Sequence, residues 1–149
     1  MSDTLGYEPR VRPTGEVAAE IAALSSSVLD IVHVQGRITE GAPMELPWDE
    51  GDDPARYCNI THLWSLYGVD DTVLEAGMTA LADRLPENGW TVAKNGPDSS
   101  RSRNHQILAV HMATRAQLEA TKRKGINGRE PLILFSVYSR FFIPVQEPL

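Results

Sequence analysis

The stretch from residue 57 to residue 67 reads YCNITHLWSLY, and its side chains alternate between two faces of an extended chain. The more apolar face carries Cys58, Ile60, His62, Trp64 and Leu66. Because a half-buried strand has a side-chain period of two, this alternation predicts a β-strand with that face turned toward the core. We expect the Cys58 thiol to be buried and unreactive, with no structural partner. His62 is expected to be a hydrogen-bonded histidine of the core or its rim rather than a metal ligand.

Three further segments are predicted to be strands, at residues 90–94, 106–113 and 131–143. The last two carry apolar side chains on both faces, as residues 132–135 illustrate. This pattern predicts that both strands lie in the centre of a sheet rather than at an edge. Turn residues separate neighbouring strands, so the pairing is expected to be antiparallel.

The first of two long helices is predicted to begin near residue 14. Apolar side chains recur at steps of three and four residues from Val17 to Ile31, which is the stripe of an amphipathic helix. Thr14 is the expected N-cap, and Gly36 is expected to end the helix. Three serines at 25–27 lower the helical propensity in its middle, so a break there is a second possibility.

The second long helix is predicted to start at Asp70 and to end before Pro86. Gly77 lies within it, at a position where close packing against a neighbour is expected. A third, short helix is predicted to end at Gly125, because Thr114 and Gln117 have the spacing of a capping box.

These elements predict an α+β fold, a twisted antiparallel sheet of about four strands with two long helices packed on one face. The 149 residues form one ordinary domain, with an N-terminal arm at 1–13, the domain at 14–143 and a C-terminal tail at 144–149. The single cysteine excludes an internal disulfide and favours a reducing compartment, so we expect a cytoplasmic protein. Neither a secretory signal nor a membrane-spanning run of apolar residues is recognisable.

The charges are unevenly distributed along the chain. The net charge is −6, but residues 1–100 have a balance of −11 and residues 101–129 a balance of +6. A basic patch is therefore predicted, with Arg101, Arg103, Lys122, Arg123 and Lys124 as its members. The favourable position of cations in the last turn of a helix explains part of this cluster without any ligand. Nucleic-acid binding is not favoured, because interleaved aromatic residues are missing and the acidic excess repels phosphates.

The segment 37–56 is predicted to be a loop, since prolines and glycines interrupt any period. A loop of this length often has a function, and this one contains a cluster of acidic residues beside a tryptophan. The candidate partner-binding residues are Trp48, Asp49, Glu50, Asp52 and Asp53. A solvated acidic loop is the plainer alternative. A calcium site is less favoured, because the alternating ligand spacing is missing.

A search for catalytic chemistry finds no phosphate-binding loop, dinucleotide fingerprint, nucleophile elbow or zinc-protease motif. Cys58 and His62 share a strand face but lie about 13 Å apart, too far for a hydrogen bond. We therefore predict no catalytic residues, no metal and no cofactor, and we lean against an enzyme.

The layout resembles a group of small actinobacterial lipoprotein-like α+β proteins of unknown function. The residues that carry this resemblance are Tyr57–Cys58, the segment 64–69 (WSLYGV), Leu85, the segment 88–92 (NGWTV) and the strand 132–142. The resemblance implies a helix-on-antiparallel-sheet domain with no known catalytic residues. Members of the group usually have a lipobox and a second cysteine that looks like the disulfide partner of the first. No lipobox signal is recognisable in this chain. The second cysteine is also missing, since residues 138–142 read YSRFF.

Two classes of function follow from these observations. The first is a non-catalytic protein-binding module, such as an immunity or adaptor protein for a locally encoded partner, in which acidic residues attract a basic partner and Trp48 anchors it. The alternative is a small-ligand-binding domain or enzyme that uses the open face of the sheet. The residues expected to line that face are Trp64, Tyr67, Trp90, Tyr138 and Phe142.

Overall fold

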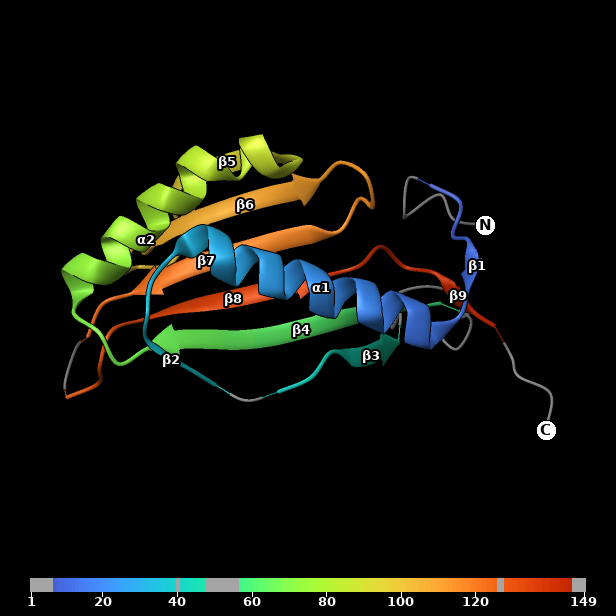
Figure 1. Ribbon diagram of the computed structural model, residues 1–149, viewed down its shortest axis with the longest axis horizontal. Helices are drawn as coiled ribbons and strands as arrows, with labels where there is room; N and C mark the ends of the chain where they lie inside the picture. The colour runs from blue at the N-terminus through green and yellow to red at the C-terminus, as the bar shows by residue number, and fades with distance from the viewer. Residues whose placement is uncertain (1–6, 40, 48–56, 126–127, 146–149) are drawn as a thin grey trace.

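The computed structural model describes residues 7–39, 41–47, 57–125 and 128–145 (Figure 1). The elements in chain order are β1 (Val11–Arg12), α1 (Thr14–Val32), β2 (Arg37–Ile38), β3 (Met44–Pro47), β4 (Cys58–Tyr67), α2 (Asp71–Arg84), the 3₁₀ turn η1 (Pro86–Asn88), β5 (Trp90–Pro97), β6 (His105–His111), β7 (Gln117–Arg123), β8 (Leu132–Tyr138) and β9 (Ile143–Pro144). The α+β class is confirmed, with two α-helices and a mostly antiparallel sheet among these residues.

The main sheet has seven strands rather than about four. Its order is β2-β4-β8-β7-β6-β5, with β3 also paired to β4, and every pairing in it is antiparallel. The four predicted strands are all present, and β8 and β6 lie inside the sheet as their two apolar faces indicated. The additional strands are β2 and β3, which lie in the predicted loop, and β7, which lies where a short helix was predicted.

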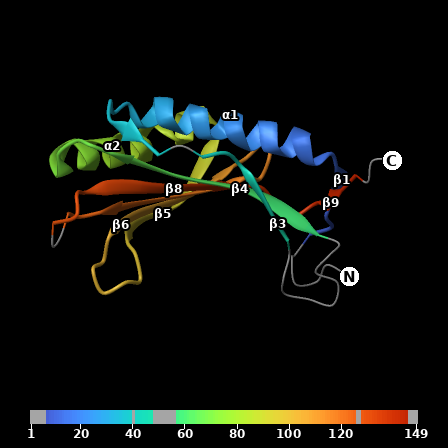
Figure 2. The same cartoon turned by 90° about the horizontal axis from the view of Figure 1, so that it is seen from below.

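Both helices lie on one face of the sheet, as Figure 2 shows from the side. The α1 stripe from Val17 to Ile31 packs on β4, which presents Ile60, Trp64 and Leu66 on this face, and the apolar side of α2 packs on β7 and β8. The Trp64 ring stacks on Phe135 of β8, with ring centres 4.0 Å apart. The facing predicted for β4 from its alternation is therefore correct.

Close contact between the two helices depends on Gly77. A Cβ atom at this position would lie 3.0 Å from side-chain methyls of Val32 and Val34, at the C-terminal end of α1. Since this distance is tighter than nine in ten of the contacts that real Cβ atoms make, a larger residue would have to push these methyls aside by a few tenths of an ångström. The expectation of close packing at Gly77 is confirmed.

The ends of α1 differ from the prediction. Pro13 occupies the N-cap position and Thr14 is the first helical residue, so Thr14 is not the cap. The helix ends at Val32, followed by His33 with a left-handed φ of 53°, and not at Gly36. The three serines do not break the helix.

The predicted third helix is wrong, because the Thr114 hydroxyl closes a turn between β6 and β7 instead of capping a helix. Its Oγ1 accepts a hydrogen bond from the Ala116 N–H at 3.2 Å and lies 2.8 Å from Nδ1 of His111. Arg115, between them, has a φ of 63°. The chain therefore reverses and continues as β7, with Leu118 and Ala120 facing the core.

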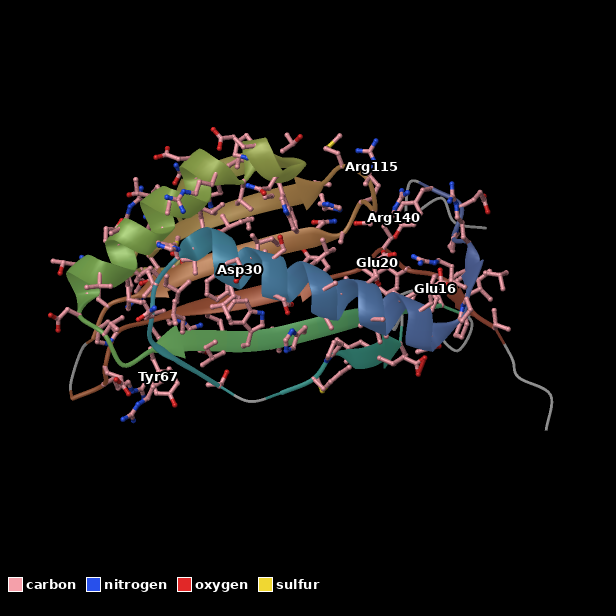
Figure 3. All side chains as sticks on the ribbon, in the orientation of Figure 1. Glu16, Glu20, Asp30, Tyr67, Arg115 and Arg140 are labelled. Carbon is pink, nitrogen blue, oxygen red and sulfur yellow. The ribbon has the colours of Figure 1, made fainter. Side chains whose placement is uncertain are left out.

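Residues of the predicted arm pair with the far end of the chain. Strand β1 runs parallel to β9, with Val11 opposite Ile143 and Arg12 opposite Pro144. Arg12 also forms ion pairs of 2.9 Å with Glu16 and 3.0 Å with Glu20, which fix β1 to the first turns of α1. Figure 3 shows both glutamates on the same side of that helix.

Candidate functional site

The predicted partner-binding cluster, Trp48, Asp49, Glu50, Asp52 and Asp53, lies outside the described residues. Its attachment points are described. The segment leaves the end of β3 and returns at the start of β4, and these two strands are antiparallel neighbours. Along the chain, the cluster therefore falls between these two strands.

The members of the predicted basic patch are divided between the two faces of β7, although Arg103, Lys122 and Lys124 line one cavity of about 310 Å³. Lys122 is buried, with only 3 % of its surface exposed, and it faces the helices from the inner side of β7. Arg123 is the next residue of the same strand, so its exposed side chain leaves from the opposite face. Arg101 and Arg103 are exposed in the turn between β5 and β6, and Lys124 is exposed beyond the end of β7. Strand alternation thus divides residues that are adjacent in sequence.

Lys122 belongs to a network of polar groups beneath α2. Its Nζ lies 2.6 Å from Asp71 and 3.3 Å from Glu75. Glu75 also bonds Nδ1 of His105 at 2.7 Å, while Nε2 of that ring lies 2.6 Å from the Asn95 side-chain oxygen. Two carboxylates compensate the charge of the buried Lys122 ammonium, and both ring nitrogens of His105 have hydrogen-bond partners. This arrangement ties α2 to β5, β6 and β7.

A second group of charges holds the N-terminal segment against the sheet. A cavity of about 530 Å³ lies there, lined by Arg12, Arg115 and Arg140 as well as by glutamates. The Arg140 guanidinium lies 3.6 Å from the centre of the Tyr7 ring, and the Tyr7 hydroxyl accepts a hydrogen bond from the Phe141 N–H at 2.9 Å. Figure 3 shows Arg115 and Arg140 near this end of α1. Because acidic and basic side chains are mixed in its walls, the cavity does not select one sign of charge.

The face of the main sheet opposite the helices is covered by no helix of the described chain (Figure 2). An antiparallel sheet exposed on one face normally places polar side chains there. Here the outer positions of the inner strands include Leu108 and Val110 of β6 and Leu134 of β8. Toward the β3 edge, Leu63 is 51 % exposed and Met44 is also 51 % exposed. We call this face, with its apolar residues Met44, Leu46, Leu63, Leu108, Val110 and Leu134, the uncovered face.

Several polar side chains on the uncovered face are hydrogen-bonded to one another. The Tyr138 hydroxyl of β8 donates to Glu119 at 2.8 Å and lies 3.0 Å from Gln117, both on the neighbouring strand β7. Burial of the hydroxyl, and then its hydrogen bond to the Glu119 carboxylate, raise the pKa of Tyr138 above its usual range. The tyrosine is therefore a fixed neutral side chain, suited to packing against a partner and not to proton transfer.

The five aromatic residues expected on the open face do not gather there. Trp64, Trp90 and Phe142 are buried in the core on the helix side. Tyr67 and Tyr138 remain on the uncovered face, because they occupy the alternate positions of β4 and β8. The aromatic lining predicted for an open pocket is thus wrong for these three residues. Their positions face the helices, and burial there removes the apolar rings from water.

Cys58 is buried as predicted, with 5 % of its surface exposed. It does have a neighbour, because its thiol lies 3.5 Å from a carboxylate oxygen of Glu45 on β3, so the expectation of no partner is wrong. Burial and the nearby negative charge raise the pKa of Cys58 to about 12. A thiol in this environment stays protonated and is a poor nucleophile.

His62 is a hydrogen-bonded histidine at the rim of the core, as expected. Its Nδ1 lies 2.8 Å from the Ser25 hydroxyl and its Nε2 lies 3.3 Å from the carbonyl oxygen of Gly41. Within the described ranges, no three histidine, cysteine or carboxylate side chains come together as a metal site. In the same part of the chain, neither helix is long and apolar enough to cross a membrane.

Comparisons with protein families, with curated proteins and with solved structures found no match for this chain. The resemblance to lipoprotein-like proteins stays a prediction.

Proposed function

We propose that the protein is a non-catalytic protein-binding module that contacts its partner through the uncovered face of the sheet. The proposed role is that of an immunity or adaptor protein in the cytoplasm, where a single buried cysteine suits the reducing conditions.

One observation carries the proposal: inner strands of the sheet keep apolar side chains on the face without a helix. Leu134 on β8 is partly exposed there near the well-exposed Leu63 of β4, and Leu108 and Val110 are partly exposed on β6, two strands beyond β8. Burial of such side chains by a second protein stabilises a complex by roughly 25 cal/mol for each Å² removed from water. The polar outer positions of β7 separate the apolar residues of β6 from those of β4 and β8, and apolar side chains grouped on an exposed face mark interaction sites on soluble proteins.

Charge supplies the second part of the proposal. The acidic cluster at 49–53 follows β3, which ends at Pro47, and precedes β4, which begins at Cys58. A partner with a basic rim around an apolar centre would be attracted by these carboxylates and would gain both association rate and orientation.

The test compares baits that differ at one exposed apolar residue. Leu63→Glu places a charge on the uncovered face, and the matched control Val73→Glu changes a residue that is 40 % exposed on α2. Each bait is incubated with an extract of the source organism, and the captured proteins are measured by quantitative mass spectrometry. We expect a protein that wild type and Val73→Glu enrich equally and Leu63→Glu enriches at least tenfold less, since a lost anchor costs more than about 1.4 kcal/mol.

The charge contribution is measured separately on the purified partner. Neutralising Asp49, Glu50, Asp52 and Asp53 should slow association several-fold at low salt and leave dissociation nearly unchanged. Equal capture by wild type and Leu63→Glu would refute the proposed surface. A wild-type dimer that only Leu63→Glu dissociates in sedimentation would assign the face to a second copy of the chain instead, and would also overturn the proposal.

A further inference from the structure

A cavity of about 310 Å³ lies where the turn between β5 and β6 meets the end of β7 and the first half of α2. Its basic wall residues are Arg103, Lys122 and Lys124. The two lysines are two residues apart along the chain, and Arg123 between them does not line the cavity, as strand alternation requires. Three of the five residues of the predicted basic patch therefore meet around one hollow, whose volume is at the small end of the range for ligand sites.

The acidic residue in this wall, Glu75, is already engaged by other groups. Its Oε2 lies 3.3 Å from Nζ of Lys122, and its Oε1 lies 2.7 Å from Nδ1 of His105. Lys122 has a second carboxylate partner in Asp71, at 2.6 Å. These contacts hold Lys122 and Glu75 in fixed positions on one side of the cavity.

The other two cations of the wall lack such partners. Arg103 and Lys124 are exposed, and neither side chain forms an ion pair or a hydrogen bond with any described residue. An arginine presents five N–H donors in a planar fork and a lysine presents three, so together they can surround the oxygen atoms of one anion. Because the nearby acids are bonded to Lys122 and His105, an anion that binds here does not have to displace an ion pair from either cation.

The turn between β5 and β6 fixes the backbone from which the Arg103 side chain starts. The Asp98 carboxylate accepts hydrogen bonds from the N–H groups of Ser100, at 3.0 Å, and Asn104, at 3.1 Å. The Asp98 N–H donates to the Asn104 carbonyl oxygen at 2.8 Å. Between these bonds Arg103 has a left-handed φ of 49°, which is uncommon for a residue other than glycine and is often found at ligand contacts. The base of the guanidinium side chain is therefore positioned before a ligand binds.

From these contacts we propose that the cavity binds the phosphate group of a small phosphate monoester, with Arg103 and Lys124 in contact with the phosphate oxygens. A monoester carries close to two negative charges above neutral pH, which matches the two free cations, and its three terminal oxygens accept from their N–H groups. A phosphodiester or a single carboxylate has one charge and two such oxygens, so it satisfies the two cations less well. Glu75 and Lys122 place the cavity on the helix side of the sheet, so the inference goes beyond the proposed function and does not depend on the uncovered face.

The backbone amide signals of residues 103–105 and 122–124 provide a direct test, with glycerol 2-phosphate as the probe. In ¹⁵N–¹H spectra recorded at pH 8 and constant ionic strength, the probe should shift these signals in a saturable manner. Dimethyl phosphate carries one negative charge, and succinate carries two charges on separate carboxylates. Each of these two anions should bind about tenfold more weakly than glycerol 2-phosphate, because neither places two charges on one group.

Two double variants that remove the same net charge provide a matched comparison. Arg103→Asn with Lys124→Gln removes both proposed contacts, and asparagine is used because it tolerates a left-handed φ. Arg101→Asn with Arg123→Gln changes exposed cations that do not line the cavity. The first pair should weaken binding of glycerol 2-phosphate by about tenfold or more, and the second should leave it within about twofold of wild type.

The wild-type titrations decide the main point if the first double variant does not fold. The proposal is overturned if glycerol 2-phosphate produces no saturable shift in the wild type, or if the two double variants lose affinity equally. It is also overturned if dimethyl phosphate or succinate binds as tightly as the monoester.

Discussion

The Lys122 network predicts that removing its negative charges and removing its positive charge have very different consequences. The first variant, Asp71→Asn with Glu75→Gln, keeps the shapes of both side chains and leaves Lys122 as a buried, uncompensated cation. The second variant, Lys122→Met, replaces the cation with an apolar side chain of similar length. The amide introduced by Glu75→Gln retains an oxygen that can accept from His105, so the first variant isolates the loss of charge.

The expected losses in free energy of unfolding follow from how far each of the three charged side chains is exposed to water. The Lys122 side chain is 4 % exposed, whereas those of Asp71 and Glu75 are 49 % and 47 % exposed. Water can therefore solvate the carboxylates when Lys122 is absent, but cannot reach the ammonium when the carboxylates are absent. Breaking a buried ion pair costs about 3–5 kcal/mol. Because the acids lie at the rim, we expect the lower end for the neutralised acids, about 3 kcal/mol, and a change within about 1 kcal/mol for Lys122→Met.

The free energy of unfolding is measured in urea at pH 7 by tryptophan fluorescence, with far-UV circular dichroism as a second probe. In thermal unfolding the neutralised acids should lower Tm by roughly 6–12 °C. Combining Lys122→Met with the two acid substitutions should restore most of the loss, since no charge then remains buried. Equal costs for the two variants, or additive costs in the combination, would refute the assignment of the instability to a stranded cation.

Three further changes test the packing described above. Gly77→Val should destabilise the fold by about 1–3 kcal/mol more than Ala76→Val on the exposed side of α2, as urea unfolding of both will show. Ser139→Ala removes the acceptor of the buried Ile60 N–H and should cost about 1–3 kcal/mol, with faster amide exchange at residue 60; unchanged exchange would contradict the role of that hydroxyl. The thiol of Cys58 should react with a maleimide at pH 7 only after denaturation, and Cys58→Ala should cost about 1 kcal/mol at pH 7 through lost packing. Because its folded pKa of about 12 exceeds the ordinary 9.0, wild type should lose stability relative to Cys58→Ala as the pH rises above 9; parallel stability curves for the two proteins would show the thiol to be accessible.

The strands that the sequence predicts well are those whose pattern is local. In β4 each alternate residue from Cys58 to Leu66 is apolar or partly so, and in β8 the run at 132–135 is apolar throughout. Tertiary contacts reinforce what such patterns already indicate, so the prediction and the structure agree.

Strand β7 could not be predicted in this way because its inner position at Lys122 is charged. That residue is compatible with a core only through Asp71 and Glu75, which lie on α2 about fifty residues earlier. The same distant pairing explains why Lys122 is buried while its neighbour Arg123 is exposed. Likewise, Ser25 does not break α1, because its hydroxyl has a partner in His62 on β4.

A cavity beside Ser25 was not predicted, since its members come from α1, the segment before β3 and β4. The serines and His62 were each noted in the sequence, but nothing in their spacing indicates that they meet. Strands β2 and β3 were missed because they are short, exposed and interrupted by prolines and glycines, so they carry no period to recognise.

The two edges of the sheet restrict how another chain can add to it. On one side, β2 and β3 cover opposite ends of β4, and between them Thr39 hydrogen-bonds to the backbone of Ser65. On the other, β5 has an irregularity between Val92 and Lys94 and ends at Pro97, features that natural proteins use to prevent edge-to-edge aggregation. Among the described strands, neither edge offers a long, regular row of free backbone groups. The molecule is thus protected against fibril-like growth by strand addition, and a segment that joined it as an extra strand would first have to displace β2 or β3.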